Sequence, residues 1–375
     1  MITRTTIQSI EKRPFKGKAI LLFGARQVGK TTLLEYLINI RKEKVLHVSG
    51  DEPDIRSLLS SITSTELKSY IGDNTIFFID EAQRIPNIGL TLKLITDKLK
   101  NIQVIATGSS SFEMANEMNE PLTGRKFEFN LFPLSFQEMV NHHGLLEEKR
   151  QLEQRLIYGS YPEVISNPQD SQELLNLITD SYLYKDILML DSLKRPKLLE
   201  KILKALALQV GSEVSYNEIA QLVGADKGTI DKYVHLFEQT FVLFSLPSFS
   251  RNVRNELKKS KKIYFYDCGV RNAIVGNFNK LQNRTDVGSL WENYLISERI
   301  KKHHYNGFRQ QSYFWRTTQQ QEIDLIEETN DTLNAFEFKW NETSKAKIPK
   351  TFTNNYPEAE TQIISPSNYH NFLQL

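Results

Sequence analysis

The sequence predicts an α/β protein that begins with a parallel β-sheet, and two observations support this fold class. First, short runs rich in β-formers alternate with amphipathic stretches over the first 135 residues, as in a parallel sheet covered by helices. Second, a chain of 375 residues is too long for one hydrophobic core, so two to four domains are expected. The runs expected to form strands are Ala19–Phe23, Val45–Val48, Ile76–Ile79, Val104–Ala106 and Lys126–Leu131.

The composition indicates a globular chain, because 40% of its residues are hydrophobic and 25% are charged. A net charge of +2 is too balanced to indicate a nucleic-acid or membrane partner. The single cysteine, Cys268, excludes an internal disulfide and a Cys-rich zinc site, and it fits a reducing compartment, so a cytoplasmic protein is expected. No apolar run is long enough to span a bilayer and no signal peptide is recognisable, so neither membrane insertion nor export is expected.

The segment GARQVGKTT, residues 24–32, matches G-x-x-x-x-G-K-[ST] between the strand-like AILLF and the helical LLEYLINI. Gly24 and Gly29 let the loop curl so that backbone N–H groups and the start of the next helix face phosphates. Lys30 is expected to neutralise the β- and γ-phosphates of ATP, and Thr31 to bind Mg²⁺. Thr32 is expected to pack in the helix or to contact the α-phosphate. The predicted nucleotide-binding residues are Gly24, Arg26, Gln27, Val28, Gly29, Lys30, Thr31 and Thr32.

An acidic pair follows the third expected strand. Buried strands of a parallel sheet deliver side chains at their carboxyl ends, and Ile76–Ile79 is followed directly by Asp80 and Glu81. Asp80 is expected to accept a hydrogen bond from Mg²⁺-bound water, and Glu81 to polarise the attacking water. The pair therefore predicts ATP hydrolysis. The alternative is a solvated acidic pair that caps the next helix.

Polar side chains also follow the fourth expected strand, where Thr107, Ser109 and Ser110 could reach the γ-phosphate or the attacking water. Ser109 is favoured by its position, and an ordinary serine-rich turn is the alternative. Arg125 precedes the fifth strand and is expected either to stabilise transition-state charge, in cis or in trans, or to be solvated. A role in trans would require a homo-oligomer. Arg26 is expected either to contact phosphate or to be exposed.

The middle of the chain changes character. Residues 138–207 have helical spacing and predict a lid or connector. Tyr216–Val223 and Lys227–Glu238 predict a helix-turn-helix, with a wing strand at Phe241–Leu246. Its second helix is only mildly basic, but residues 251–262 contain six lysines and arginines suited to phosphates, so the module is expected to bind double-stranded DNA or to dock another protein. The expected domains are 1–137, 138–207, 208–262 and 263–375.

The segment EIDLIEETNDTLNAFEFKW, residues 322–340, predicts a β-hairpin. If its turn centres on Asn330–Asp331, then Asp324 lies opposite Glu337, and Glu322 opposite Lys339. Opposed carboxylates repel each other, so a cation is expected between them, with Lys339 on the same face to orient or activate a water. The alternative is an exposed charged face with a Glu322–Lys339 pair. One face of the hairpin is expected to be apolar and to carry Ile323, Leu325, Phe336 and Phe338.

These motifs, together with ATGS at 106–109, GR at 124–125, LFPLSF at 131–136, GSYPEV at 159–164, FYDCG at 265–269, WEN at 291–293 and FEFK at 336–339, resemble the archaeal-type AAA+ P-loop ATPases that carry a C-terminal PD-(D/E)XK-like domain. The resemblance implies a P-loop AAA+ parallel sheet core, a helical lid, a winged helix-turn-helix and a C-terminal restriction-nuclease-like α/β domain. It also implies that Glu292, Asp324 and Glu337 hold Mg²⁺ for phosphodiester hydrolysis.

The function expected from the residues and the resemblance is Mg²⁺-dependent ATP hydrolysis coupled to a winged helix and a nuclease-like module acting on DNA. Two alternatives remain. One is a nucleotide-gated switch for a protein partner, and the other is a DNA-binding regulator or defence component without nuclease activity, because a nuclease-like domain can persist as a binding module.

Overall fold

The chain divides into two compact units, which are described separately. The first consists mainly of Met1–Phe132, and the second mainly of Pro133–Tyr184, Arg195–Glu238 and Val242–Leu375. The computed structural model describes residues 2–109, 122–183, 195–250, 261–308, 310–329, 332–341 and 347–374. Within these ranges no helix is both long and apolar enough to cross a membrane.

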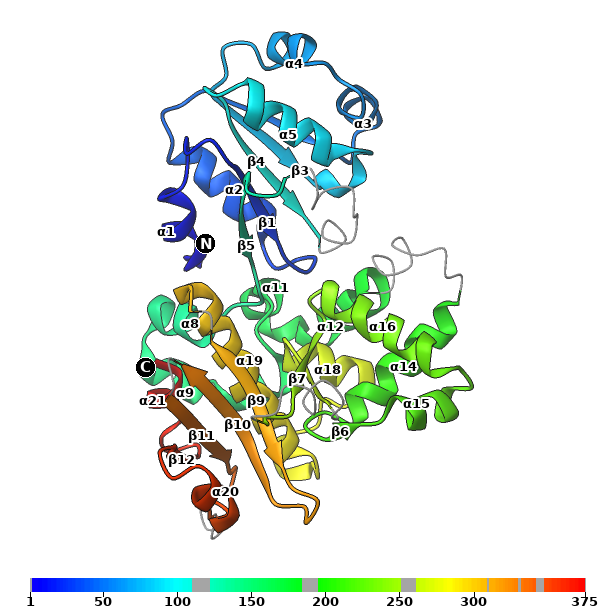
Figure 1. The fold of residues 1–375 in the computed structure, drawn as a ribbon, viewed down its shortest axis with the longest axis vertical. Helices are drawn as coiled ribbons and strands as arrows, with labels where there is room; N and C mark the ends of the chain where they lie inside the picture. The colour runs from blue at the N-terminus through cyan, green and yellow to red at the C-terminus, as the bar shows by residue number, and fades with distance from the viewer. Residues whose placement is uncertain are drawn as a thin grey trace. The chain divides into compact units, whose positions relative to one another are not determined.

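The first unit is built on a five-stranded, entirely parallel sheet with the order β2-β3-β4-β1-β5 (Figure 1). Its strands are β1 (Ala19–Phe23), β2 (Val45–Ser49), β3 (Ile76–Asp80), β4 (Gln103–Gly108) and β5 (Lys126–Asn130). Every residue of β1, β3 and β4 is buried, as expected for strands covered by helices on both faces. The five strands expected from the sequence are therefore confirmed.

The strand order creates the place for a ligand. The helices of this unit are α1 (Thr6–Glu11), α2 (Lys30–Asn39), α3 (Pro53–Leu59), α4 (Ser64–Ile71), the 3₁₀ turn η1 (Ala82–Arg84) and α5 (Ile88–Lys98). The chain leaves β1 through α2 and continues to β2 at the far edge, whereas β4 and β5 return to either side of β1. In parallel sheets, ligands bind outside the carboxyl ends of the strands where the order reverses in this way.

The second unit begins with helices, as the spacing of residues 138–207 predicts. They are α8 (Phe136–His143), α9 (Leu145–Arg150), α10 (Leu152–Tyr158), α11 (Pro162–Ser166), η2 (Pro168–Asp170), α12 (Ser171–Leu177), the π-helix η3 (Ile178–Leu183) and α14 (Pro196–Leu208). Gly159 separates α10 from α11, and a Cβ there would lie 2.0 Å from Oδ1 of Asp267. Asp267 accepts hydrogen bonds from the backbone N–H of Ser160 (2.7 Å) and of Val270 (3.0 Å), and so joins this break to α18 (Cys268–Val275).

A three-stranded antiparallel sheet with the order β6-β8-β7 accompanies two short helices. The elements are β6 (Glu213–Val214), α15 (Tyr216–Val223), α16 (Lys227–Gln239), β7 (Leu243–Pro247) and β8 (Lys261–Phe265). Both helices lie where the sequence predicts them. The expectation that residues 251–262 form a basic surface is wrong for Lys262, which is 1% exposed and faces acidic side chains. Successive side chains of a strand point to opposite faces, so Lys262 points inward from β8. Its members Arg251, Arg254, Lys258 and Lys259 lie outside the described residues.

The C-terminal part of this unit packs a helix against a four-stranded sheet with the order β12-β11-β10-β9 (Figure 1). The strands are β9 (Gln311–Arg316), β10 (Glu322–Thr329), β11 (Thr332–Phe338) and β12 (Glu360–Ile364); the helices are α19 (Val287–Asn306), α20 (Lys350–Asn355) and α21 (Tyr369–Gln374), with η4 (Leu281–Asn283) before them. The expected hairpin register is confirmed, because Leu325 pairs with Phe336 and Thr329 with Thr332. The turn residues Asn330 and Asp331 lie outside the described residues.

The expected division of this hairpin into one apolar and one charged face is wrong. The pairing of β10 with β9 shifts between Ile323 and Ile326, and such a bulge breaks the alternation of side chains. Ile323 and Ile326 therefore belong to one core cluster, whereas Phe336 packs on Phe372 of α21. The apolar residues of the hairpin thus serve both faces.

A buried ion pair fixes α19 to this sheet. Glu327 of β10 is fully buried and accepts hydrogen bonds from Nε and Nη2 of Arg299, at 2.9 and 2.8 Å. Nε2 of His303 lies 2.7 Å from the same carboxylate. Burial opposes ionisation of Glu327, but the bonds from His303 and Arg299 outweigh it and lower the pKa of Glu327 to about 2.

Candidate functional site

The P-loop connects the end of β1 to the start of α2. Gly24 is required by close packing, because a Cβ there would lie 2.2 Å from the carbonyl oxygen of Leu131. Gly29 has a φ of 92°, a conformation that side chains disfavour, and directly precedes α2. Lys30 is 6% exposed, and its Nζ donates to the carbonyls of Gly24 (2.8 Å) and Ala25 (2.9 Å). The lysine thus lies along the loop that would carry phosphates.

The loop meets the acidic end of β3. Oγ1 of Thr31 donates to Oδ2 of Asp80 at 3.0 Å, and Oγ1 of Thr107 donates to the other oxygen, Oδ1. A hydroxyl beside a carboxylate is a donor set that suits Mg²⁺, because this ion prefers one or two protein oxygens and keeps several waters. The residues expected to hold Mg²⁺, Thr31 and Asp80, are therefore adjacent, and their oxygens fit the ion.

Glu81 is held by a residue that sequence reasoning missed. Nε2 of Gln83 donates to Oε2 of Glu81 (2.5 Å) and to Oγ of Ser109 (3.1 Å). The backbone N–H of Glu81 donates to Oγ1 of Thr107 (3.2 Å), and the residue has a φ of 47°. Its side chain does not cap the following turn, contrary to the alternative reading of the acidic pair. The only sequence signal for Gln83 was its position two residues after Glu81, and this spacing alone does not predict that the two side chains bind each other.

The other residues expected in the loop are placed as follows. Val28 is fully buried, Arg26 and Gln27 are half-buried, and Thr32 is exposed on α2. Ser110 lies outside the described residues.

Arg4, which sequence reasoning also missed, binds the P-loop through hydrogen bonds. Its Nη1 donates to the carbonyl of Val28 and its Nη2 to that of Phe132, both at 2.6 Å. Arg4 is 4% exposed and precedes α1. Nothing in its local sequence indicates this contact with the P-loop.

Arg125 lies away from the phosphate loop of its own chain. Its backbone carbonyl pairs with the N–H of Ala19, at the start of β1, whereas the P-loop follows the end of that strand. Its Nε donates to Oδ1 of Asp97 at 2.8 Å. The expected role in cis is therefore corrected, because β1 separates Arg125 from the loop. A role in trans stays a prediction.

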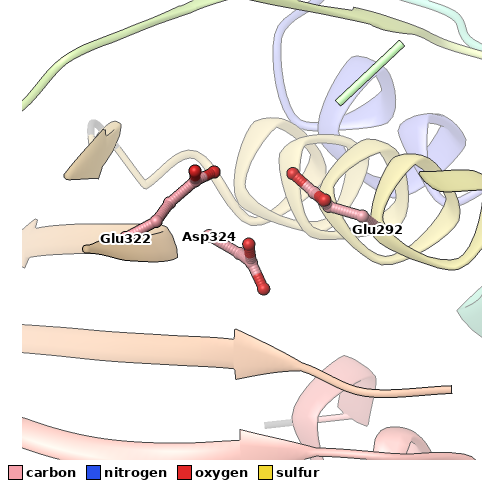
Figure 2. A group of neighbouring side chains, drawn as sticks. All are labelled: Glu292, Glu322 and Asp324. Carbon is pink, nitrogen blue, oxygen red and sulfur yellow. The ribbon is translucent and has the colours of Figure 1, made fainter. Parts of the chain in front are cut away.

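A cluster of carboxylates forms in the second unit. Oxygens of Glu292 on α19 and of Glu322 and Asp324 on β10 all lie within 4.8 Å of one another. Figure 2 shows the Glu292 side chain reaching from the helix toward the two acidic side chains of the strand. Burial, reinforced by the charges of Glu292 and Glu337, raises the pKa of Asp324 well above its ordinary value. This site favours a further cation or a proton.

The cluster differs from the expected set in one member. The sequence pairs Asp324 with Glu337, but the described β10–β11 pairing ends at Leu325, and the N–H of Phe338 donates to Oδ2 of Asp324 at 2.8 Å. Glu337 instead accepts from Nζ of Lys339 at 2.6 Å. Glu322 takes its place among the grouped oxygens. The alternative Glu322–Lys339 pair is not formed.

Lys262 and Tyr264 of β8 complete the surroundings of Glu292. Nζ of Lys262 lies 3.0 Å from Oε1 of Glu292 and also forms an ion pair with Glu322. Oη of Tyr264 donates to the same Oε1 at 2.5 Å. Sequence reasoning assigned Lys262 to a surface patch, because the partners of β8 are far away in the sequence.

Comparisons with known proteins agree with the first unit and leave the second without an assigned role. Residues 16–140 match the AAA domain family, residues 149–281 a domain of unknown function (DUF8612), and residues 287–371 another domain of unknown function (DUF4143).

Two relatives that match most of this chain are uncharacterized proteins. An uncharacterized protein of Haemophilus influenzae is 25% identical over 307 residues, covering 74% of this chain and 75% of its own. One from Methanocaldococcus jannaschii is 24% identical over 368 residues, covering 92% and 80%. The crystal structure of Cdc6p from Pyrobaculum aerophilum, 11% identical over 72% of this chain and 93% of that one, gives a TM-score of 0.28, too low to carry an argument. Residues 16–140 are thus similar to the AAA domain family, and the two regions that follow are similar to families of unknown function.

Proposed function

We propose that the protein binds Mg²⁺-ATP at the P-loop and hydrolyses it. The observation that carries this proposal is the contact between Thr31 and Asp80 at 3.0 Å, because it joins the two metal-binding motifs of a P-loop site. Lys30 would neutralise phosphate charge, and Thr31 and Asp80 would hold the Mg²⁺ that offsets further charge on the phosphates. Glu81 would orient and polarise the attacking water, with Gln83 and Ser109 fixing its carboxylate.

Steady-state phosphate release tests this proposal. Lys30→Ala should abolish ATP binding, whereas Glu81→Gln should retain it and lose hydrolysis by about 10²–10⁴-fold, the usual contribution of a positioned base. Glu35→Gln is the matched control, because Glu35 is exposed on α2. A wild-type protein that binds ATP and releases no phosphate would favour the nucleotide-gated switch. Unchanged release by Glu81→Gln would refute the role of Glu81.

A second activity, metal-dependent phosphodiester hydrolysis, is favoured by the carboxylate cluster on α19 and β10. Three carboxylate oxygens within 4.8 Å of one another suit a divalent cation, and Lys339, which is paired with Glu337, would orient a water beside them. The reaction class is hydrolysis of DNA. Supercoiled plasmid with Mg²⁺ or Mn²⁺ tests it, with Asp324→Asn as the loss-of-function variant. No nicking by the wild type under either metal would favour a regulator without nuclease activity.

The elements from β6 to β8 support a winged helix that binds double-stranded DNA. Helix α16 buries Ile230 and Phe237 and exposes Lys227 and Lys232, the arrangement of a helix that enters a groove. The double variant Lys227→Glu/Lys232→Glu should weaken duplex binding in fluorescence anisotropy and reduce its salt dependence. Lys201→Glu, exposed on α14, is the control. Equal binding by both variants would instead favour a protein-docking module.

A further inference from the structure

A deeply buried lysine of the second unit, Lys262, lies among the carboxylates of the candidate metal centre. Lys262 is 1% exposed and sits in the middle strand of the β6-β8-β7 sheet, paired with Glu213 on one side and Leu246 on the other. Its ammonium contacts two of the three clustered acids, Glu292 at 3.0 Å and Glu322 in a closer ion pair.

A buried ammonium needs such partners, because desolvation of an unpaired charge is costly. Glu292 and Glu322 supply these partners at ion-pair distance, so the lysine is held by the same oxygens that would coordinate a metal. Of the other nearby positive groups, Nε of Arg316 lies 3.6 Å from Oε2 of Glu322, and Lys339 is bound to Glu337.

A divalent ion and the ammonium would use the same carboxylate oxygens. A divalent ion would bind these oxygens at roughly 2.0–2.6 Å, depending on the metal. An ammonium 3.0 Å from Oε1 of Glu292 would then lie within a few ångströms of that ion, so the two cations would repel each other and compete for the same oxygens. A metal that enters must displace the ammonium from Glu292 and Glu322.

We propose that Lys262 is the resident counter-ion of the carboxylate cluster and competes with a divalent cation for Glu292 and Glu322. This inference rests on the metal centre proposed above. Tyr264, two residues further along β8, donates to the same oxygen of Glu292, so one strand holds that carboxylate through two side chains. The positions of Lys262 and Tyr264 on β8 therefore set the metal affinity of the cluster. A shift of β8, which belongs to the β6-β8-β7 sheet, would change that affinity.

Mn²⁺ binding to the nucleotide-free, full-length protein tests the proposal by calorimetry. Lys262→Met removes the charge at similar length and should bind Mn²⁺ at least tenfold more tightly than the wild type. Lys261→Met is the matched control, because the neighbouring lysine is exposed, and it should bind like the wild type. Adding Asp324→Asn to Lys262→Met should abolish the gain, which assigns the binding to the cluster rather than to Asp80.

The failures are distinguishable. If the wild type binds Mn²⁺ at the cluster and Lys262→Met binds it equally or more weakly, then Lys262 does not compete with the metal. The proposed metal centre would still hold. No binding at the cluster by either protein would overturn both proposals. A crystal structure of the wild type with Mn²⁺ tests the competition without relying on the fold of a variant. Nζ of Lys262 should then lie more than about 4 Å from Oε1 of Glu292. Mn²⁺ at the cluster with that contact intact would refute the inference.

Discussion

Arg4 is expected to stabilise the P-loop by two buried hydrogen bonds, and Arg4→Met tests this. Methionine keeps an unbranched apolar stem but removes the donors to the carbonyls of Val28 and Phe132, both at 2.6 Å. Val28 and Phe132 are 0% and 2% exposed, so water does not replace the lost donors easily. Leaving one buried acceptor without a partner costs about 1–3 kcal/mol, so two cost about 2–6 kcal/mol.

Hydrogen exchange and ATP calorimetry measure the effect. Peptides covering residues 24–32 should exchange at least about 30-fold faster, which corresponds to roughly 2 kcal/mol of local opening free energy. ATP should bind more weakly, because Val28 immediately precedes Gly29 and Lys30 and the loop must be ordered to receive phosphates. Arg4→Lys should fall between the two proteins, since one ammonium cannot reproduce a planar two-pronged donor.

The control is Lys12→Met, a similar substitution at an exposed position directly after α1. It should change neither loop exchange nor ATP affinity. If Arg4→Met behaves like this control in both measurements, then the two hydrogen bonds do not order the P-loop and the reasoning is refuted.

Three further outcomes follow from the geometry. Gln83→Leu should lower phosphate release by about tenfold or more with ATP affinity nearly unchanged, because Glu81 loses the donor that fixes its carboxylate; unaltered turnover would contradict this. The pKa of Glu327 is lowered to about 2, so the ionised carboxylate contributes roughly 3 kcal/mol to the free energy of unfolding above pH 4.5. This contribution is lost as the pH falls toward 2. The free energy of unfolding of Glu327→Gln, measured against pH, should therefore lack this change. Gly159→Ala should lower the melting temperature by several degrees, since its Cβ would meet Asp267, and an unchanged melting curve would exclude that clash.

The parallel sheet and the meeting of Thr31 with Asp80 were predictable from local patterns. Strands β1 and β3 are short, mainly apolar runs, and the carboxyl ends of parallel strands lie on one edge. Thr31 and Asp80 follow two such strands, so their meeting needs no knowledge of distant packing. The hairpin register was also predictable from local sequence, because a single turn connects the strands that carry Leu325 and Phe336.

Contacts between elements far apart in the chain were not predictable. Arg4 reaches a carbonyl 128 residues away, and Lys262 reaches Glu292 from a strand that looks, in sequence, like the end of a basic surface segment. A lysine in an exposed patch and a lysine buried among acids have the same local sequence. Only the packing of β8 against α19 decides between them.

The exchange of Glu337 for Glu322 in the acidic cluster has a local cause that periodicity cannot show. The bulge between Ile323 and Ile326 disturbs β10 where Asp324 lies, and the N–H of Phe338 bonds to the Asp324 side chain there. Glu337 is then held by Lys339, while Glu322 turns to the lysine of β8. A rule that pairs residues by counting along two strands holds only while both strands are regular. The acidic residues were therefore predictable as a group, but which of them cluster and which lysine each one binds required the three-dimensional structure.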